Sequence, residues 1–519
     1  MRRLLVVFLA TTFALAGAAP MATAAPATQH CAPDPTAPKQ QLRAEWIASV
    51  TNIDWPSQRG LPADQQKAEL IRWYDEAVAL GLNAVVVQIR PTADAFWPSP
   101  YEPWSHWLTG AQGQNPGYDP LAFAVEEAHK RNLEFHGWFN PYRVSMGTDV
   151  NALVPTHPAR VHPDWIVAYG GKLYYNPGIP EVRKFTTDAI MDAVRRYDID
   201  AVHFDDYFYP YPVAGQTFND AAQYAQYGGG LSLADWRRSN IDALISGLSS
   251  AIRSAKPWVQ FGVSPFAVWR NAATDPAGSP TQAGVQTYDD LYADTVKWVR
   301  EEWIDYIVPQ VYWNIGFAVA DYAKIVPWWS NVVAGTDVHL YVGHANHKVA
   351  NPAQPAAWQD PAEMSRQLTF NRDYPAVKGD IYFSAAQVRA NRLSHMSVVK
   401  ADHYQHPAVP PTADRLEARG PSAPLAVDVT RTPTGVRLRW VSKAATSFAV
   451  YRLDGHAFVE RCDLSDATNL LGTVRAGRGP LHTFTDTIAV PGQHYTYVVT
   501  ALDRSHNESR PSVPRFIRA

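Results

Sequence analysis

The chain has 519 residues, a length that predicts roughly two to four domains. Hydrophobic residues make up 46% of it, which is enough for a large buried core. The formal net charge of −3 leaves no basic stripe to pair with phosphates, so nucleic acid is excluded as a main partner. The 18 Trp and 25 Tyr fit either a large core with ordinary surface rings or a carbohydrate surface, since the C–H faces of sugars stack on flat aromatic rings.

The first 25 residues, MRRLLVVFLATTFALAGAAPMATAA, predict a secretory signal peptide. Two arginines precede an apolar run, and Ala-Thr-Ala at 22–24 is a cleavage pattern. The residues before Cys31, ATQH, lack the small apolar character of a lipid-attachment site, and no later stretch is apolar enough to span a bilayer. We therefore expect a secreted or cell-wall-associated protein without a transmembrane segment in the mature chain. Cys31 and Cys462 are compatible with one disulfide or with two free thiols.

Residues 43–404 repeat one rhythm, in which a short apolar strand is followed by a polar or aromatic loop and an amphipathic helix. The expected strands lie at 44–50, 83–91, 134–142, 201–208, 259–266, 305–313, 339–346 and 379–385. Strands that alternate with helices predict parallel βα units, and eight such units match a (β/α)8 TIM barrel. A doubly wound open sheet is the alternative, but it would normally carry a Gly-rich loop after the first strand, and SVTNIDWPS does not resemble one.

The remaining chain predicts a linker and an all-β domain. Residues 405–424 are rich in Pro and Ala, and residues 425–519 contain short alternating strands without helices, which is typical of a β-sandwich. This segment resembles a fibronectin type III domain through Trp440, FAVYR at 448–452 and YTYVVTALDRSHNESRPS at 495–512. The resemblance implies a spacer or adhesion module, with cell-wall association through this domain and no chemistry of its own.

Polar side chains gather where the expected strands end, and the active site of a TIM barrel forms there. Because side chains alternate along a strand, His203 and Asp205 should share the face at the barrel mouth, whereas Phe204 and Asp206 should share the other face. Asp206 is then expected to anchor the loop or to support the site. The candidates for substrate contact are Arg90, Trp138, Asn140, Arg143, His203, Tyr207, Gln310, Tyr312, Trp313 and Asn314. The alternative for each is structural, as a helix cap, a turn former or a core ring.

Glycoside hydrolysis needs two carboxyl groups that flank the scissile bond, one to protonate the leaving oxygen and one to attack or to activate water. Asp205 is the expected nucleophile or base. Its partner should come from another strand or loop, because adjacent residues point apart, and Glu102 and Asp94 are the first candidates. The tryptophans around Glu102 predict a raised pKa for its carboxyl. Asp206 completes the set of candidate acids, and no metal or cofactor is expected.

Six stretches resemble the bacterial glycosyl-hydrolase-like family ten, a set of exported barrel proteins. They are RAEWIASVTNIDWPS, NAVVVQIRPTADAFWPSPYEPWSHWLTG, FHGWFNPYRV, AVHFDDYFYPYP, FGVSPFAVWRN and IVPQVYWNIG, and they span about residues 43–400 in order. The resemblance implies a glycoside-hydrolase barrel and suggests a bacterial cell-wall polymer as substrate, such as peptidoglycan glycan strands stripped of their peptides. Many members are lipoproteins, and this chain lacks that signal, so its location is expected to differ.

Three functions follow from these patterns. The leading one is a secreted glycoside hydrolase that acts on a cell-wall or related polysaccharide by two-carboxylate acid/base catalysis. The second is a carbohydrate-binding barrel without turnover. The third is a metal-dependent hydrolase built on His136, His203, Asp205 and His344, which is less favoured because the usual metal-ligand spacings are missing from the sequence.

Overall fold

The computed structural model describes residues 31, 34, 36–416 and 418–519, so the predicted signal peptide lies outside the described residues. Within these ranges no helix combines the length and the apolar character needed to cross a membrane. Neither of the two cysteines is a free thiol.

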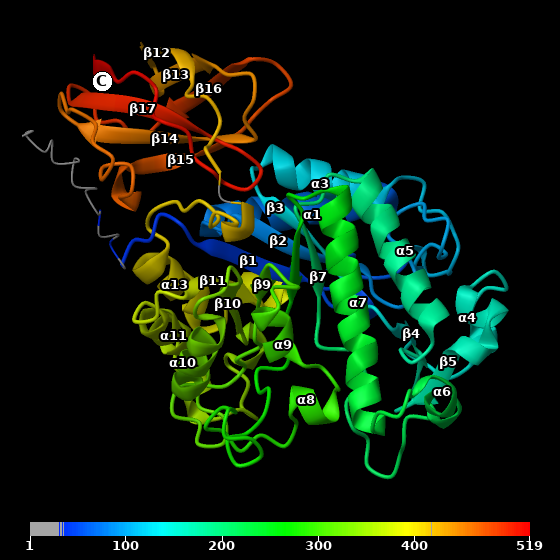
Figure 1. The fold of residues 1–519 in the computed structure, drawn as a ribbon. Coiled ribbons are helices and arrows are strands. Elements are labelled where there is room, and N and C mark those ends of the chain that lie inside the picture. Colours follow the sequence, from blue (N-terminus) through cyan, green and yellow to red (C-terminus); the bar gives the residue numbers. More distant parts are fainter. Residues whose placement is uncertain (1–30, 32–33, 35, 417) are drawn as a thin grey trace, which may run out of the picture. The chain divides into compact units, whose positions relative to one another are not determined.

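Eight parallel strands close into a barrel, which confirms the predicted fold (Figure 1). They are β1 (Leu42–Ile47), β2 (Ala84–Arg90), β3 (Glu134–Phe139), β7 (Ala201–Phe204), β8 (Gln260–Val263), β9 (Tyr306–Ile307), β10 (His339–His344) and β11 (Val377–Tyr382). Neighbours in the barrel are also neighbours in the chain, and β11 closes the ring by pairing with β1. Each expected strand overlaps an observed one.

A helix follows every barrel strand. These helices are α1 (Ala63–Leu80), α3 (Pro120–Lys130), α5 (Pro180–Arg196), α7 (Leu233–Ala255), α9 (Thr295–Arg300), α10 (Tyr322–Val333), α11 (Glu363–Asn371) and α13 (His395–His403). Their ends carry local signals. Asp119 caps α3 by accepting the backbone N–H of Ala122, and Gly81 ends α1 with a φ of 87°, which is favourable only for glycine.

Side-chain alternation divides the barrel core into two clusters. On β2, Val85 and Val87 join the large cluster between strands and helices, whereas Ala84 and Val86 join a smaller cluster inside the barrel. Tyr306 belongs to the inner cluster, and its ring occupies the space beside Gly262, where an added Cβ would come within 2.0 Å of the ring. The barrel interior is therefore a packed floor beneath the carboxyl ends of the strands.

The loop after β3 carries an inserted antiparallel sheet of β4 (Arg143–Ser145), β6 (Lys172–Tyr175) and β5 (Ile166–Tyr169). In this sheet Arg143 pairs with Tyr174. Other loops hold the short helices α2 (His106–Thr109), α4 (Pro158–Val161), α6 (Ala221–Tyr227), α8 (Thr287–Asp290) and α12 (Ala385–Ala390). The insertion brings Arg143 to the same end of the barrel as Asp205, and the site is built there.

The C-terminal segment folds into two antiparallel sheets, as the alternating pattern predicts. One has the order β12 (Leu425–Thr432), β13 (Gly435–Val441) and β16 (Leu481–Asp486), and the other has β15 (Leu470–Arg475), β14 (Ser447–Asp454), β17 (His494–Leu502) and β18 (Arg515–Arg518). Trp440 and Phe448 come from different sheets and meet in the core, with ring centroids 5.2 Å apart. The likeness to fibronectin type III remains a prediction.

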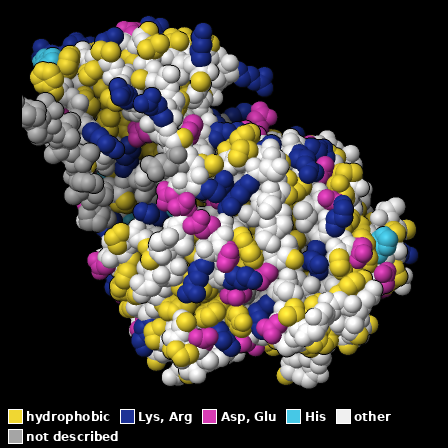
Figure 2. Space-filling view, in the orientation of Figure 1, with side chains coloured by type: hydrophobic (Ala, Val, Ile, Leu, Met, Phe, Trp, Pro, Cys, Tyr) yellow, Lys and Arg dark blue, Asp and Glu magenta, His cyan; other side chains and the backbone are white. Residues whose placement is uncertain are grey.

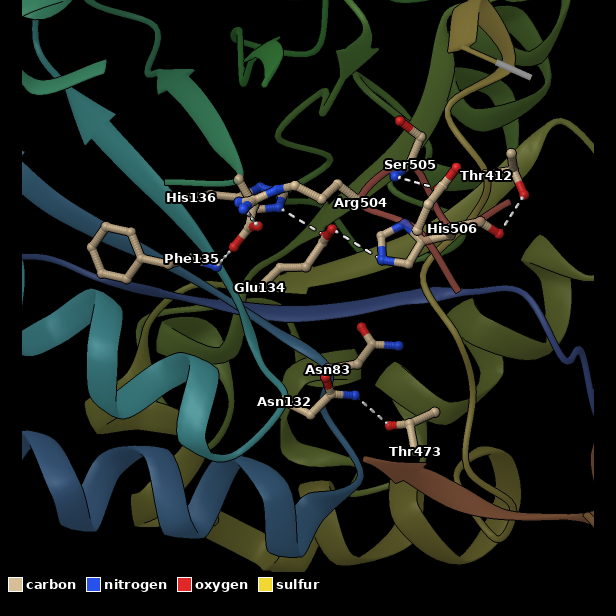
Figure 3. A network of polar contacts seen from close by, with 12 residues as sticks. Asn83, Asn132, Glu134, Phe135, His136, Thr412, Thr473, Arg504, Ser505 and His506 are labelled. Carbon is tan, nitrogen blue, oxygen red and sulfur yellow. Dashed lines mark hydrogen bonds and ion pairs between the residues drawn. The ribbon is translucent and has the colours of Figure 1, made fainter. Parts of the chain in front are cut away.

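Polar contacts join this segment to the amino ends of the barrel strands (Figure 3). His506 lies 3.3 Å from Glu134 at the start of β3, and Arg504 lies 3.2 Å from Asp200 just before β7. This end of the barrel is opposite the carboxyl ends of the strands, so the network supports the scaffold and not the site. Elsewhere, basic and acidic side chains lie mixed over the face shown in Figure 2, in keeping with the small net charge.

Candidate active site

Asp205 follows the last residue of β7 and is held by donors from the neighbouring strand β3. Trp138 Nε1 donates to Oδ2 at 3.0 Å, and Asn140 Nδ2 lies 3.1 Å from both carboxylate oxygens. The backbone N–H of Tyr207 donates to Oδ1 at 3.1 Å. These donors come from fixed backbone and a packed indole, so the carboxyl group has one defined orientation.

Opposing effects set the protonation of Asp205. Its side chain is almost sealed from solvent, with 4% of the residue exposed, and burial raises the pKa of its carboxyl. The positive charge of Arg143 and the donors from Asn140, Tyr207 and Trp138 act in the opposite direction, because they stabilise the ionised form. Asp205 is thus a buried carboxyl whose anion is solvated by the protein.

Asp206 turns to different partners but belongs to the same site. Its Oδ2 accepts a hydrogen bond from the Tyr211 hydroxyl, and the Gln310 side chain, whose Nε2 donates to the carbonyl of Ser264, lies beside the carboxyl and helps to lower its pKa. Burial and the nearby charge of Asp205 raise the pKa of Asp206 to about 6. The expected alternation does not extend to Asp206, because the strand ends at Phe204 and the loop then turns. Asp206 both anchors this loop and faces the candidate residues after β9.

A row of half-buried aromatic rings begins with Tyr211, whose hydroxyl donates to Asp206. Tyr211 contacts Tyr207 with centroids 5.6 Å apart and Phe266 with centroids 6.4 Å apart. Phe266 in turn contacts Trp313, 5.4 Å away, and Tyr312 packs edge-on against His347. These rings are partly open to solvent beside the carboxyl pair. Rings in that position can stack against the apolar faces of sugars.

His203 supports the floor of the site and does not carry charge. Trp46 Nε1 donates to its Nε2 at 3.1 Å, Ser264 Oγ lies 2.9 Å from the same nitrogen, and Nδ1 lies 3.1 Å from the Tyr306 hydroxyl. Burial lowers the pKa of His203 well below its usual value, so the ring is neutral. Because Nε2 accepts from Trp46, the proton sits on Nδ1 and is donated to Tyr306.

The residues of the metal-site alternative have other partners. His136 contacts Glu134 and the Tyr306 hydroxyl, and His344 contacts Gln367 and Asp380. Across the described ranges no group of three or more His, Cys, Asp or Glu side chains has a geometry that could hold a metal ion.

Glu102 is held by Arg90 in a two-point ion pair, and both side chains are completely buried. Arg90 Nε donates to Oε2 at 2.7 Å and Nη2 donates to Oε1 at 2.5 Å. Arg90 also donates to the backbone carbonyl groups of Asn140 and Pro141. Burial raises the pKa of Glu102, and the charge of Arg90 opposes the increase. The pair therefore braces the loop after β2 against the loop after β3.

Asp94 is also fully buried. Burial acts to raise the pKa of Asp94, but the nearby His106, 3.7 Å away, and the hydrogen bond from the Thr92 backbone N–H lower it below its usual value. Among the described residues, neither Asp94 nor Glu102 makes a hydrogen bond or ion pair with Asp205 or Asp206. Asp94 and Glu102 are therefore held by partners in their own loop.

The other expected contact residues divide between the two carboxyls. Trp138, Asn140, Arg143 and Tyr207 surround Asp205, whereas Gln310 lies beside Asp206. Asn314 donates from Nδ2 to the carbonyl of Ile315 in its own turn.

Sequence reasoning missed two residues that shape the site. Tyr211 reaches Asp206 from five residues further along the chain, and Trp46 reaches His203 from the first strand. The aromatic-proline run YFYPYP was the available signal for Tyr211. No local pattern distinguishes Trp46 from an ordinary core ring.

Comparisons with known proteins identify a family and several relatives. The family model described as glycosyl hydrolase-like 10 matches residues 41–360, a range that contains every candidate site residue named above. The Bacillus subtilis (strain 168) protein named glycosyl hydrolase YngK is 50% identical over 483 residues, which cover 91% of this chain and 92% of that protein. Glycosyl hydrolase DigH of Escherichia coli (strain K12) is 42% identical over 365 residues, covering 66% of this chain and 83% of that protein.

Among solved structures, the glycoside hydrolase domain of PgaB (BpsB) from Bordetella bronchiseptica aligns with 70% of this chain and 99% of its own. The TM-score of that alignment is 0.45, and the sequence identity is 12%.

Proposed function

Because the chain belongs to the glycosyl hydrolase-like 10 family and is a glycoside hydrolase, we propose that it is secreted and cleaves a bacterial cell-wall polysaccharide, with Asp205 and Asp206 as its acid–base pair. Peptide-free peptidoglycan glycan strands are the proposed substrate, on the strength of the family resemblance. The signal-peptide pattern at the N-terminus supports export, and the C-terminal sheets are proposed to contact the wall.

Asp206 is assigned the proton donor. Burial and the charge of Asp205 raise the pKa of Asp206, so Asp206 keeps its proton to higher pH than an ordinary aspartate does. Asp205 has three hydrogen-bond donors and the charge of Arg143 to stabilise its anion, so we assign the proton to Asp206 and the anion to Asp205. A pKa raised to about 6 leaves Asp206 partly protonated near neutral pH, which suits a general acid.

Asp205 is assigned the nucleophile or base. Its oxygens are fixed by Trp138 and Asn140, so the reacting carboxylate needs no reorganisation when substrate binds. Protonation of the glycosidic oxygen by Asp206 and attack or water activation by Asp205 would together complete the hydrolysis. The single observation that carries this assignment is the pair of buried carboxyls on adjacent residues beside half-buried aromatic rings at the carboxyl end of β7.

Product analysis tests the proposal. Wild-type protein is incubated with peptide-free glycan strands, with intact peptidoglycan and with a panel of polysaccharides, and the products are identified by mass spectrometry. We expect oligosaccharides from the peptide-free strands, and a fall in turnover of roughly 10²–10⁴-fold for Asp205→Asn with strand binding retained. If the wild type binds glycan but releases no product from any substrate, the protein is a carbohydrate-binding barrel and the proposal fails.

Asp54 provides a matched control for burial. Its pKa is also raised to about 6 by burial, but its oxygens accept hydrogen bonds from the backbone of Ala48 and Ala386 and from the Ser384 hydroxyl. Asp54→Asn should lower the melting temperature and leave turnover per folded molecule within about threefold of wild type, because Asp54 acts on the scaffold. The assignment is rejected if Asp54→Asn loses turnover while Asp205→Asn keeps it.

A further inference from the structure

Arg143 is a buried cation with unused hydrogen-bond donors. Only 6% of the residue is exposed, at the first position of β4. Its Nε donates to the carbonyl of Pro91 at 3.1 Å, and its guanidinium carbon lies 5.2 Å from the ring centroid of Tyr207. Nη1 and Nη2 have no hydrogen-bond or ion-pair partner anywhere in the described part of the chain. Four N–H donors therefore remain available on one guanidinium group.

Two tyrosines border these free donors. The pairing of β4 with β6 places Tyr174 opposite Arg143, and Tyr207 lies against the guanidinium. Burial raises the pKa of both tyrosines, so both hydroxyls stay protonated at neutral pH. Within the described ranges neither hydroxyl is hydrogen-bonded, and neither is among the fully enclosed polar atoms that lack a partner. The guanidinium and the two hydroxyls together present several hydrogen-bond donors to a ligand.

Asp205 does not form an ion pair with Arg143. Arg143 favours the anion of Asp205 at a distance, but the two side chains are not within ion-pair contact. The oxygens of Asp205 already accept from Trp138, Asn140 and the Tyr207 backbone. The terminal nitrogens of Arg143 are not among the fully enclosed polar atoms that lack a partner, so a ligand can reach them, and a carboxylate fits their planar fork.

We propose that Arg143, Tyr174 and Tyr207 bind a carboxylate group carried by a sugar next to the scissile bond. This inference rests on the proposed function. In peptide-free peptidoglycan strands each muramic acid residue carries such a carboxylate on its lactyl ether. When the peptide is attached, the same carbon forms a neutral amide, which cannot pair with the guanidinium. Arg143 is then the residue that selects peptide-free strands over peptide-bearing ones.

The test compares two forms of one substrate. Peptide-free strands are used as they are, and a second portion is converted to methylamides by carbodiimide coupling with methylamine, which removes the charge and keeps the glycan. For wild type we expect a KM at least about tenfold higher on the amidated strands, in line with the loss of a two-point charged contact. Arg143→Met should raise the KM on the free-carboxylate strands to the same level, so that the preference disappears.

Two further variants complete the test. Arg143→Lys keeps the charge without the planar fork and should retain only part of the preference. Arg160→Met is the matched control, since Arg160 lies in the same insertion and donates to the carbonyl of Leu153; its preference should equal that of wild type. If Arg143→Met does not fold, the test rests on Arg143→Lys. Calorimetry then measures the binding of peptide-free strands to Asp206→Asn and to the double variant Asp206→Asn/Arg143→Lys, and the two affinities are compared.

The outcomes separate the two proposals. The carboxylate site is overturned if the wild type has equal KM values on free and amidated strands, or if Arg143→Lys keeps the full preference. The glycosidase proposal would then still stand. A wild type that cleaves neither form would instead overturn the proposed function.

Discussion

Removal of the Tyr211 hydroxyl should make Asp206 a weaker acid. This hydroxyl donates to Asp206 Oδ2 and lowers its pKa, because it stabilises the ionised form against burial and the charge of Asp205. A hydrogen bond to a charged group contributes about 1.5–3 kcal/mol, and 1.36 kcal/mol corresponds to one pH unit. Tyr211→Phe should therefore raise the pKa of Asp206 from about 6 by roughly one pH unit or more.

The assay is the pH dependence of kcat/KM on peptide-free glycan strands. If Asp206 must be protonated to act, the alkaline limb of the profile reports its pKa, and this limb should move to higher pH by roughly one unit in Tyr211→Phe. Tyr209→Phe is the control, because Tyr209 is two residues away and its hydroxyl is buried toward Asn240 and Asp220. An alkaline limb that stays in place, or that moves to lower pH in Tyr211→Phe, would refute the role given to Asp206.

Three further predictions concern the scaffold and can be measured by denaturant or thermal unfolding. Glu102→Gln leaves the buried charge of Arg90 without its partner and should cost about 3–5 kcal/mol of unfolding free energy; an unchanged midpoint would contradict the bracing role. Trp440→Ala should cost about 3–5 kcal/mol through the cavity it leaves between the C-terminal sheets, and a loss below 1 kcal/mol would indicate that this core is not packed as described. The pKa of Asp200 is lowered because the hydrogen bond and charge of His129 outweigh burial, so its folded pKa lies below its unfolded value. It therefore contributes stability above about pH 4 that is lost as the pH falls, and the difference between wild type and Asp200→Asn should shrink below pH 4; a constant difference would contradict this.

The barrel could be predicted from the sequence because alternation and strand–helix order are local patterns. Val202 and Phe204 have the parity of the outer core, and the structure confirms both positions, whereas His203, expected at the barrel mouth, lies in the buried interior against Tyr306. The strand boundary was less accurate. Residues 205–208 extend the expected strand, but β7 ends at Phe204, since aromatic loop residues have the same strand-like composition.

The site was only partly predictable, for the same reason. Trp138 and Asn140 could be placed beside Asp205, because strand ends on neighbouring strands must meet. The contact of Tyr211 with Asp206 depends on how the loop turns after β7, and the pairing of Glu102 depends on the reach of Arg90 across its loop. Neither contact follows from periodicity, so the sequence alone left Glu102 and Asp94 as the first candidates for the second carboxyl.

The most direct test of the acid–base assignment is the dependence of Asp206→Asn on the leaving group. Its kcat/KM is measured on peptide-free strands and on a dinitrophenyl glycoside of the sugar that product analysis identifies. Dinitrophenolate leaves without protonation, so the assignment predicts a loss of roughly 10²–10⁴-fold on the strands and little loss on the aryl glycoside. Asp205→Asn should lose activity on both. An equal loss on both substrates in Asp206→Asn would contradict the assignment of Asp206 as the proton donor.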